Sequence, residues 1–334
     1  MRRWILLLSA GVLIAGVISC GKDGKDKKQL TIAVIPKGTT HIFWQSVHAG
    51  AIKAARELGI HMLWIGPEKE DDRQQQIALV DNQVVNQVSG IVLAPLDEMA
   101  LRRPVRSAVK NGIPVVIIDS GLKDSESIYT SFVATDNWKG GRIGGQQLGR
   151  LLGGQGKVIA LRYAEGSAST ENRVGGFLEA IREFPGIEVV SQEQYGGVTQ
   201  STAQQAAENL LIRFKDEQGR LTIDGIFCPN SSTTYGMHQA LKRQRLAGTV
   251  KYVGFDAEDP LVEGIRKGEI NGLVLQNPFN MGYLGVKTLV DHLQGKAVEK
   301  RIDTGVLFVG PDDLDKPEIQ EMIKPDIEKW LSQQ

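Results

Sequence analysis

The sequence predicts an α/β fold made of two lobes, each built on a parallel sheet. Apolar, β-branched runs alternate with segments of helical periodicity from Leu30 to Val309, a pattern typical of βαβ units with right-handed crossovers. The pattern contains about ten strands, which is near the upper limit for one open sheet, so two sheets of about five or six strands fit better. The chain of 334 residues is also long enough for two domains.

The elements follow one another with little interruption. In the first half we predict strands at 30–35, 61–65, 90–94 and 115–118, separated by helices at 43–58, 72–87 and 99–111. Gly59, Pro95 and Gly112 mark ends of these elements, because Gly and Pro interrupt regular structure. In the second half we predict helices at 137–152, 169–183, 199–215, 233–244, 260–267, 280–293 and 317–331, with strands at 157–162, 188–192, 225–228, 250–255, 272–276 and 306–309.

The first thirty residues are not expected to belong to the fold. Arg2 and Arg3 precede an apolar run over 4–18 that is too short to cross a membrane, which is the pattern of a secretory signal peptide. Its end resembles a bacterial lipobox, with Val17 where Leu is usual. This resemblance implies a signal peptide over 1–20 and a diacylated Cys20 as the mature N-terminus; secretion without a lipid is the alternative. Residues 21–29 are rich in Lys, Asp and Gly and predict a tether.

Composition and motifs argue against several classes of function. The chain has 39 Lys plus Arg and 39 Asp plus Glu, so it lacks the basic excess of a nucleic-acid-binding surface. The glycine-rich segments 140–145 and 153–156 lie inside a predicted helix and before a strand, and neither position suits a phosphate-binding loop. The sequence has no G-x-S-x-G motif and no metal-ligand spacing. We therefore predict no catalytic residues, no metal and no cofactor, and interpret Cys228 as a small buried residue.

Polar and aromatic residues recur just past the carboxyl ends of the predicted strands. In open α/β sheets, ligands bind in the crevice outside these strand ends. The segment Val250–Asp256 shows the pattern most plainly, because a β-branched run ends in Phe255 and Asp256. The other members of the set are Lys37, His41, Phe43, Trp44, Asp119, Ser120, Asp136, Asn137, Arg173, Asn230, Gln276 and Asn277.

The chemistry of this set suits a sugar. Carboxylates, amides and guanidinium groups can each bond two neighbouring hydroxyls, and aromatic rings can pack on the C–H face of a sugar ring. Each of these residues alone is more often a helix cap or a surface group, so the hypothesis depends on several of them meeting at one edge.

At these residues the chain resembles the periplasmic sugar-binding proteins of ABC importers, in the ribose- and galactose-type cluster related to the core of LacI-type repressors. The resemblance covers about Leu30 to Val309. The motifs that carry it are Phe43-Trp44, Ile113-Pro114-Val115 through Asp119, Ala134-Thr135-Asp136-Asn137 with Gly140-Gly141, Asn172-Arg173 before Gly176-Phe177, Asn230, Val253-Gly254-Phe255-Asp256 and Gln276. It implies the type I periplasmic binding protein fold, with two Rossmann-like lobes joined by a three-segment hinge.

The resemblance also implies roles for individual residues. Phe43, Trp44 and Phe255 would stack on the sugar, and its hydroxyls would bond to Asp119, Arg173, Asn230, Asp256 and Gln276. Three positions depart from the ribose-type pattern: Ser120 replaces Arg, Lys37 replaces a small hydroxyl residue, and His41 replaces Asn. Lys37 after Pro36 is similar to relatives that bind rhamnose or a furanosyl signalling molecule. The resemblance as a whole implies a pentose or a similar monosaccharide as the ligand.

The same resemblance predicts the lobe boundaries and the mechanism. The N-terminal lobe would comprise 30–135 and 277–304, and the C-terminal lobe 136–276 and 305–334. The hinges would fall at Thr135, Asp136, Gln276, Asn277 and Thr304. We expect a monomer that closes around a sugar and delivers it to a permease, anchored by lipid in the periplasm or cell envelope. A sensing partner of a membrane receptor or kinase is the alternative. The amphipathic helix predicted at 317–331 is expected to pack on the C-terminal lobe.

Overall fold

The structure is a computed structural model that describes residues 29–332. The predicted signal peptide, Cys20 and the predicted tether up to residue 28 lie outside the described residues. Among the residues that are described, no helix is both long and apolar enough to cross a membrane.

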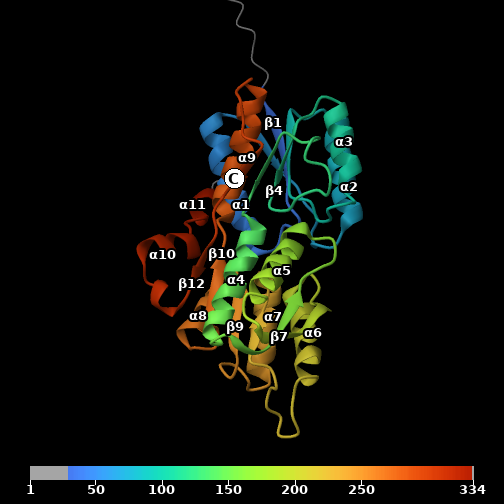
Figure 1. Cartoon of the computed structure of the whole chain (residues 1–334). Helices are drawn as coiled ribbons and strands as arrows, with labels where there is room; N and C mark the ends of the chain where they lie inside the picture. Colours follow the sequence, from blue (N-terminus) through green and yellow to red (C-terminus); the bar gives the residue numbers. More distant parts are fainter. Residues whose placement is uncertain (1–28, 333–334) are drawn as a thin grey trace, which may run out of the picture.

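The first sheet has six strands, all parallel, in the order β11-β5-β4-β3-β1-β2. Helices α1 (Ile42–Leu58) and α9 (Pro278–Leu293) cover one face, and α2 (Arg73–Val85) and α3 (Arg102–Lys110) cover the other (Figure 1). The strands are β1 (Thr31–Ile35), β2 (His61–Trp64), β3 (Gly90–Leu93), β4 (Val115–Ile118), β5 (Ser131–Ala134) and β11 (Arg301–Asp303). We call this sheet and its helices the N-terminal lobe.

The second sheet also has six strands, in the order β12-β10-β9-β8-β6-β7, and only β12 is antiparallel to its neighbour. One face is covered by α4 (Asn137–Leu151) and α5 (Ala168–Ile181) and the other by α6 (Gln200–Ile212), α7 (Ser231–Arg243) and α8 (Asp259–Arg266). The strands are β6 (Gln155–Arg162), β7 (Gly186–Tyr195), β8 (Gly225–Phe227), β9 (Lys251–Phe255), β10 (Gly272–Leu275) and β12 (Leu307–Val309). We call this sheet and its helices the C-terminal lobe.

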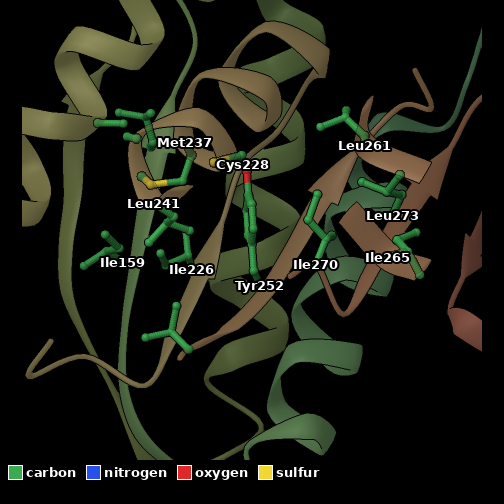
Figure 2. Close-up of a cluster of buried hydrophobic side chains, with 14 of the residues drawn as sticks. Ile159, Ile226, Cys228, Met237, Leu241, Tyr252, Leu261, Ile265, Ile270 and Leu273 are labelled. Carbon is green, nitrogen blue, oxygen red and sulfur yellow. The ribbon is translucent and has the colours of Figure 1, made fainter. Parts of the chain in front are cut away.

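The core of the C-terminal lobe contains Cys228, which was predicted to be a small buried residue. Figure 2 shows Cys228 and Tyr252 among the apolar side chains between the sheet and α7 and α8. Cys228 is fully buried, and this burial raises the pKa of its thiol to about 12. The thiol is therefore a packing group, as predicted from the sequence.

The predicted fold class is confirmed. The chain passes between the sheets three times, between β5 and α4, between β10 and α9, and between β11 and β12. The predicted hinge residues lie in these connections, and the predicted lobe boundaries follow the same division of the strands. Hinge motion and the boundaries as domain limits stay predictions.

The structure differs from the prediction in three elements. It adds strands β5 and β11, and it divides the helix predicted at 317–331. After a short 3₁₀ turn, η1 (Pro311–Asp313), the tail forms α10 (Pro317–Ile323) and α11 (Glu328–Leu331). Pro325 separates them, since proline lacks the N–H that would continue a helix. Only α10 joins the core of the C-terminal lobe, while α11 packs on α1 of the N-terminal lobe (Figure 1).

Candidate functional site

Two carboxylates, one from each lobe, end the central strands that face the cleft between the lobes. Asp119 directly follows β4 and Asp256 directly follows β9. Both have left-handed backbone conformations, with φ of 60° and 65°. Asp tolerates this conformation better than most residues, but it still costs conformational energy and such strain concentrates at functional sites. The pair was predicted from the same strand-end pattern in each half of the sequence.

The carboxylate of the N-terminal lobe is held by a buried cation. The Lys37 ammonium lies 2.7 Å from Asp119 Oδ2, and the two side chains are only 4% and 5% exposed. Apart from this ion pair, Asp119 Oδ2 has no hydrogen-bond donor among the described residues. A buried carboxylate oxygen normally has further partners, so Asp119 can still accept a hydrogen bond from a ligand hydroxyl.

The carboxylate of the C-terminal lobe belongs to a chain of charged and amide groups. Arg173 is 2% exposed and donates to Asn137 Oδ1 at 2.8 Å, to the Pro229 carbonyl at 3.0 Å and to Gln276 Oε1 at 2.6 Å. Gln276 Nε2 in turn donates to Asp256 Oδ1 at 2.6 Å. Burial lowers the pKa of Arg173, while the charges of Asp256 and Asp119 oppose that shift. The guanidinium therefore stays charged beside two carboxylates.

Close packing of α4 and α5 fixes the position of Arg173. A Cβ atom on Gly141 would lie 1.9 Å from the Arg173 carbonyl oxygen, so only glycine permits this approach. The glycine-rich segment 140–145 thus serves helix packing, as predicted, and it places the guanidinium at the cleft.

The three predicted aromatic residues have different surroundings. Phe43 and Trp44 line the cleft and contact each other edge to face, with ring centroids 4.9 Å apart. Phe255 is fully buried, and its ring lies below the Arg173 guanidinium with 4.5 Å from Cζ to the centroid. Its ring does not line the cleft cavity, so the stacking role expected for Phe255 stays a prediction. In this structure Phe255 supports Arg173.

Three other predicted residues make contacts that the sequence did not indicate. The Ser120 hydroxyl accepts from the Ser169 backbone N–H at 3.0 Å and does not line the cavity. His41 caps α1 and its Nε2 lies 3.3 Å from both Ser231 Oγ and Glu258 Oε1 of the other lobe. Asn230 lines the cavity, but its side-chain oxygen caps α7.

The site also contains residues that the sequence analysis missed. Glu70 accepts from Trp44 Nε1 and from the Tyr163 hydroxyl, both at 2.9 Å. Burial, followed by the charge of Glu70, raises the pKa of Tyr163, so its hydroxyl stays protonated and donates. Tyr163 directly follows β6, so the strand-end pattern could have identified it. Other missed residues of the cavity wall are Ser169, Thr170, Ser231 and Ser232.

The two lobes enclose a small cavity between these groups. This cleft cavity has a volume of about 40 Å³, which is room for only a few water molecules. Side chains bond across it: Lys37 Nζ donates to Ser169 Oγ at 3.1 Å, and the Tyr163 hydroxyl reaches Glu70. The lobes are therefore closed on each other, and a ligand must separate or replace these partners.

The predicted hinge residues lie beside the site. Thr135 Oγ1 and Thr304 Oγ1 are 3.5 Å apart, and Asp303 Oδ1 accepts from the Asp136 N–H at 3.2 Å. Asp136 and Asn277 cap α4 and α9, the two helices that begin immediately after a crossing. Gln276 lies in a connection between the lobes and also accepts a hydrogen bond from Arg173. A change of backbone conformation at this connection would therefore move a direct partner of Arg173.

The arrangement is that of a binding site formed between two α/β lobes. Among residues 29–332, no group of three or more His, Cys, Asp or Glu side chains is placed to hold a metal ion. The polar side chains at the cleft bond to one another in short networks, such as Gln276 with Arg173 and Asp256, and Glu70 with Trp44 and Tyr163. Fold and site together define a two-lobed solute-binding protein.

Comparison with known proteins gives the family. Residues 32–297 match the periplasmic binding protein domain, and the chain belongs to this family. Its members bind solutes for transporters and are not enzymes, as predicted, and membership implies an extracytoplasmic location. A D-allose-binding periplasmic protein of Escherichia coli is 30% identical over 265 residues, 78% of this chain and 83% of that protein. A ribose import binding protein of Haemophilus influenzae is 28% identical over 88% of this chain and 95% of that protein.

Solved structures agree with this assignment. An ABC transporter solute-binding protein of Agrobacterium vitis with bound D-fucose is 36% identical, with a TM-score of 0.83, and covers 88% of this chain and 100% of that one. A carbohydrate transporter solute-binding protein of Agrobacterium radiobacter in complex with D-arabinose is 34% identical, with the same TM-score, and covers 89% and 100%.

Proposed function

We propose that this protein captures a monosaccharide, a ribose-like pentose or a related sugar, between its two lobes and delivers it to the permease of an ABC importer. The observation that carries the proposal is that Asp119 from one lobe and Asp256 and buried Arg173 from the other line the same cleft cavity. Charged forks of this kind bond vicinal hydroxyls, and a buried charge left unpaired rejects an analogue that lacks a hydroxyl. Two relatives are named for ribose and allose, and two similar solved structures contain D-arabinose and D-fucose, which supports a monosaccharide.

The ligand contacts are proposed for the residues that line the cleft cavity. Asp119, Arg173, Asp256 and Gln276 would bond hydroxyls, with Phe43 and Trp44 against the ring. Lys37, His41 and Asn230, which line the cavity, remain proposed determinants of which sugar is held. Ser120 remains one through its bond to the Ser169 backbone, although it does not line the cavity. The relatives named above are transport proteins, and no specific observation favours a sensing partner of a receptor or kinase, so we do not propose that role.

A sugar panel tests the function. D-ribose, D-allose, D-arabinose and D-fucose are added to the protein in a thermal-shift assay, because a ligand that binds the folded state raises the melting temperature by mass action. Calorimetry then gives the Kd of the best sugar. We expect at least one to bind, and the absence of any shift or heat with all four would contradict the proposal.

Asp256→Asn tests the site assignment. Asn keeps the shape of the side chain and tolerates φ of 65°, but it removes the charge. Loss of a charged hydrogen bond costs about 2 kcal/mol, so the Kd should rise about 30-fold. The matched control is Asp81→Asn on the exposed side of α2, which should leave the Kd unchanged. Equal affinity of the Asp256→Asn variant and the wild type would refute the assignment.

The lipid anchor, the monomeric state and the permease are separate parts of the proposal. Cys20 would carry the lipid and hold the protein in the periplasm or cell envelope. Labelled palmitate should be incorporated into the wild type but not into the Cys20→Ser variant, and the variant should be found in the soluble fraction.

The monomeric state is tested separately. Light scattering of the purified protein should give the mass of one chain. Transport of the bound sugar in cells should be lost when the ABC permease encoded beside this protein is deleted.

A further inference from the structure

A second, larger cavity lies between the C-terminal tail and both lobes. We call it the tail cavity, and its volume is about 440 Å³. Its walls are the tail segment 322–328, residues 41–43 of the N-terminal lobe and residues 257–259 of the C-terminal lobe. A volume of this size is usual for small-molecule sites, and the cleft cavity is far smaller. The tail therefore encloses space that the predicted sugar site does not use.

The tail cavity adjoins the cleft cavity directly. His41, Phe43, Ser231, Asp256 and Gln276 line both of them. These side chains form the partition between the two spaces. The cross-lobe contacts of His41 in this partition are 3.3 Å long, near the outer limit for a hydrogen bond. Because five residues belong to both walls, a ligand long enough to pass this partition would extend from the cleft into the space under the tail.

The walls of the tail cavity select the chemistry of such an extension. Apolar side chains from three separate segments line it: Ile42, Phe43, Leu275, Met322, Ile323 and Ile327. The charged groups in its wall are mostly carboxylates, namely Asp256, Glu258, Asp259, Asp326 and Glu328, against Lys324. Lys324 is itself paired with Asp259 at 3.2 Å. Asp259, Asp326 and Glu328 are exposed and screened by solvent, so the partly buried Asp256 and Glu258 are the carboxylates that disfavour an anionic group there. The apolar side chains favour an uncharged apolar group.

The tail wall is held in place from both sides. In α10, Ile319 is 5% exposed and packs into the core of the C-terminal lobe, and Arg266 of α8 bonds Asp315 at 2.8 Å. Beyond Pro325, α11 packs on α1, where Arg56 lies 5.8 Å from the centre of the Trp330 ring. Figure 1 shows the tail in red running from the C-terminal lobe to the N-terminal lobe. The tail segment therefore contacts both lobes in the closed structure and forms a fixed wall of the tail cavity.

We infer that the tail cavity is a second compartment of the ligand site, which takes an uncharged apolar substituent carried by the sugar. The ligand class is a glycoside or another sugar with an apolar ring-sized group, and sugar phosphates and sugar acids are excluded. This inference rests on the proposed function, because the sugar ring itself would occupy the cleft cavity.

Calorimetry with three probes tests the inference. The probes are D-fucose, phenyl β-D-fucopyranoside and 4-carboxyphenyl β-D-fucopyranoside; if another sugar of the panel binds best, it and its two matching glycosides replace them. We expect the phenyl glycoside to bind at least as tightly as the free sugar and the carboxyphenyl glycoside at least tenfold more weakly. If no free sugar and no glycoside binds, the proposed function falls together with the inference. If the free sugar binds and the phenyl glycoside is more than tenfold weaker, the inference alone is refuted.

Two tail variants localise the effect. Ile323→Trp fills the tail cavity, and a stop after Ile323 removes most of its tail wall while keeping α10. Both should weaken the phenyl glycoside at least tenfold and leave the Kd of the free sugar within threefold, since neither changes a residue of the cleft cavity. A variant that binds the glycoside as well as the wild type, or loses both probes equally, would overturn the second compartment.

Discussion

The ion pair between Lys37 and Asp119 allows a quantitative test of how the cleft is held together. The change is Lys37→Met, which keeps the length of the side chain and removes the ammonium. The two groups are 2.7 Å apart and about 4–5% exposed, so solvent screens them little. Removing one partner of a buried pair leaves an uncompensated charge and typically costs about 3–5 kcal/mol. We expect a loss of about 3 kcal/mol in unfolding free energy.

Urea unfolding followed by circular dichroism measures this loss, and two further proteins complete the experiment. The matched control is Lys123→Met, because the Lys123 side chain is 56% exposed and its ammonium lies 4.0 Å from Glu98 Oε1; exposed pairs contribute about 0–1 kcal/mol. The double variant Lys37→Met with Asp119→Asn should be at least about 1 kcal/mol more stable than the sum of the single effects predicts. If Lys37→Met costs no more than Lys123→Met, or the double variant shows no coupling, the buried pair does not stabilise the cleft.

Three further predictions concern packing, burial and pH. Gly141→Ala should lower the unfolding free energy by about 2–3 kcal/mol, because its Cβ would lie 1.9 Å from the Arg173 carbonyl oxygen; an unchanged urea transition would contradict this close approach. The Cys228 thiol, whose pKa burial raises to about 12, should resist a thiol reagent, monitored at this residue by mass spectrometry, until the chain unfolds. Burial lowers the pKa of His48 from 6.5 to about 4. As pH falls from about 6.5 to about 4, His48 is protonated in the unfolded chain before it is protonated in the folded chain, so the unfolding free energy should decrease over this range. His48→Phe, which can keep the stack on Trp64, should reduce this decrease.

Much of the fold could be predicted because buried parallel strands are continuous apolar runs. The two strands that were missed explain the limit of this signal. Strand β11 has the sequence Arg-Ile-Asp and lies at the edge of its sheet, where charged residues are common and no apolar run is needed. Strand β5 has only four residues and directly precedes a crossing, and no strand was predicted there. The division of the tail helix was readable from Pro325.

The site could be predicted in outline for a similar reason. Parallel strands bring their carboxyl ends to one edge, so Asp119, Asp256 and Gln276 were found from position alone. Glu70 was missed because it lies in a loop several residues beyond β2, and only the three-dimensional structure brings it to Trp44 and Tyr163. The position of Phe255 below Arg173 was likewise not readable, since alternation along a strand does not tell which groups cover a ring.

The hydrogen bonds that protein groups already make at the closed cleft must be replaced when a sugar binds. Lys37 of the N-terminal lobe donates to Ser169 across the cleft. Within the C-terminal lobe, Gln276 donates to Asp256. The protein's own groups therefore occupy positions that sugar hydroxyls would take. Arrival of a sugar is then an exchange of one set of hydrogen bonds for another, and net affinity comes from the difference between the two sets. Where a sugar lacks one hydroxyl, the protein group that bonded there before binding is not replaced by a sugar hydroxyl. Discrimination between closely similar sugars would therefore depend on how well each competes with Lys37 and Gln276.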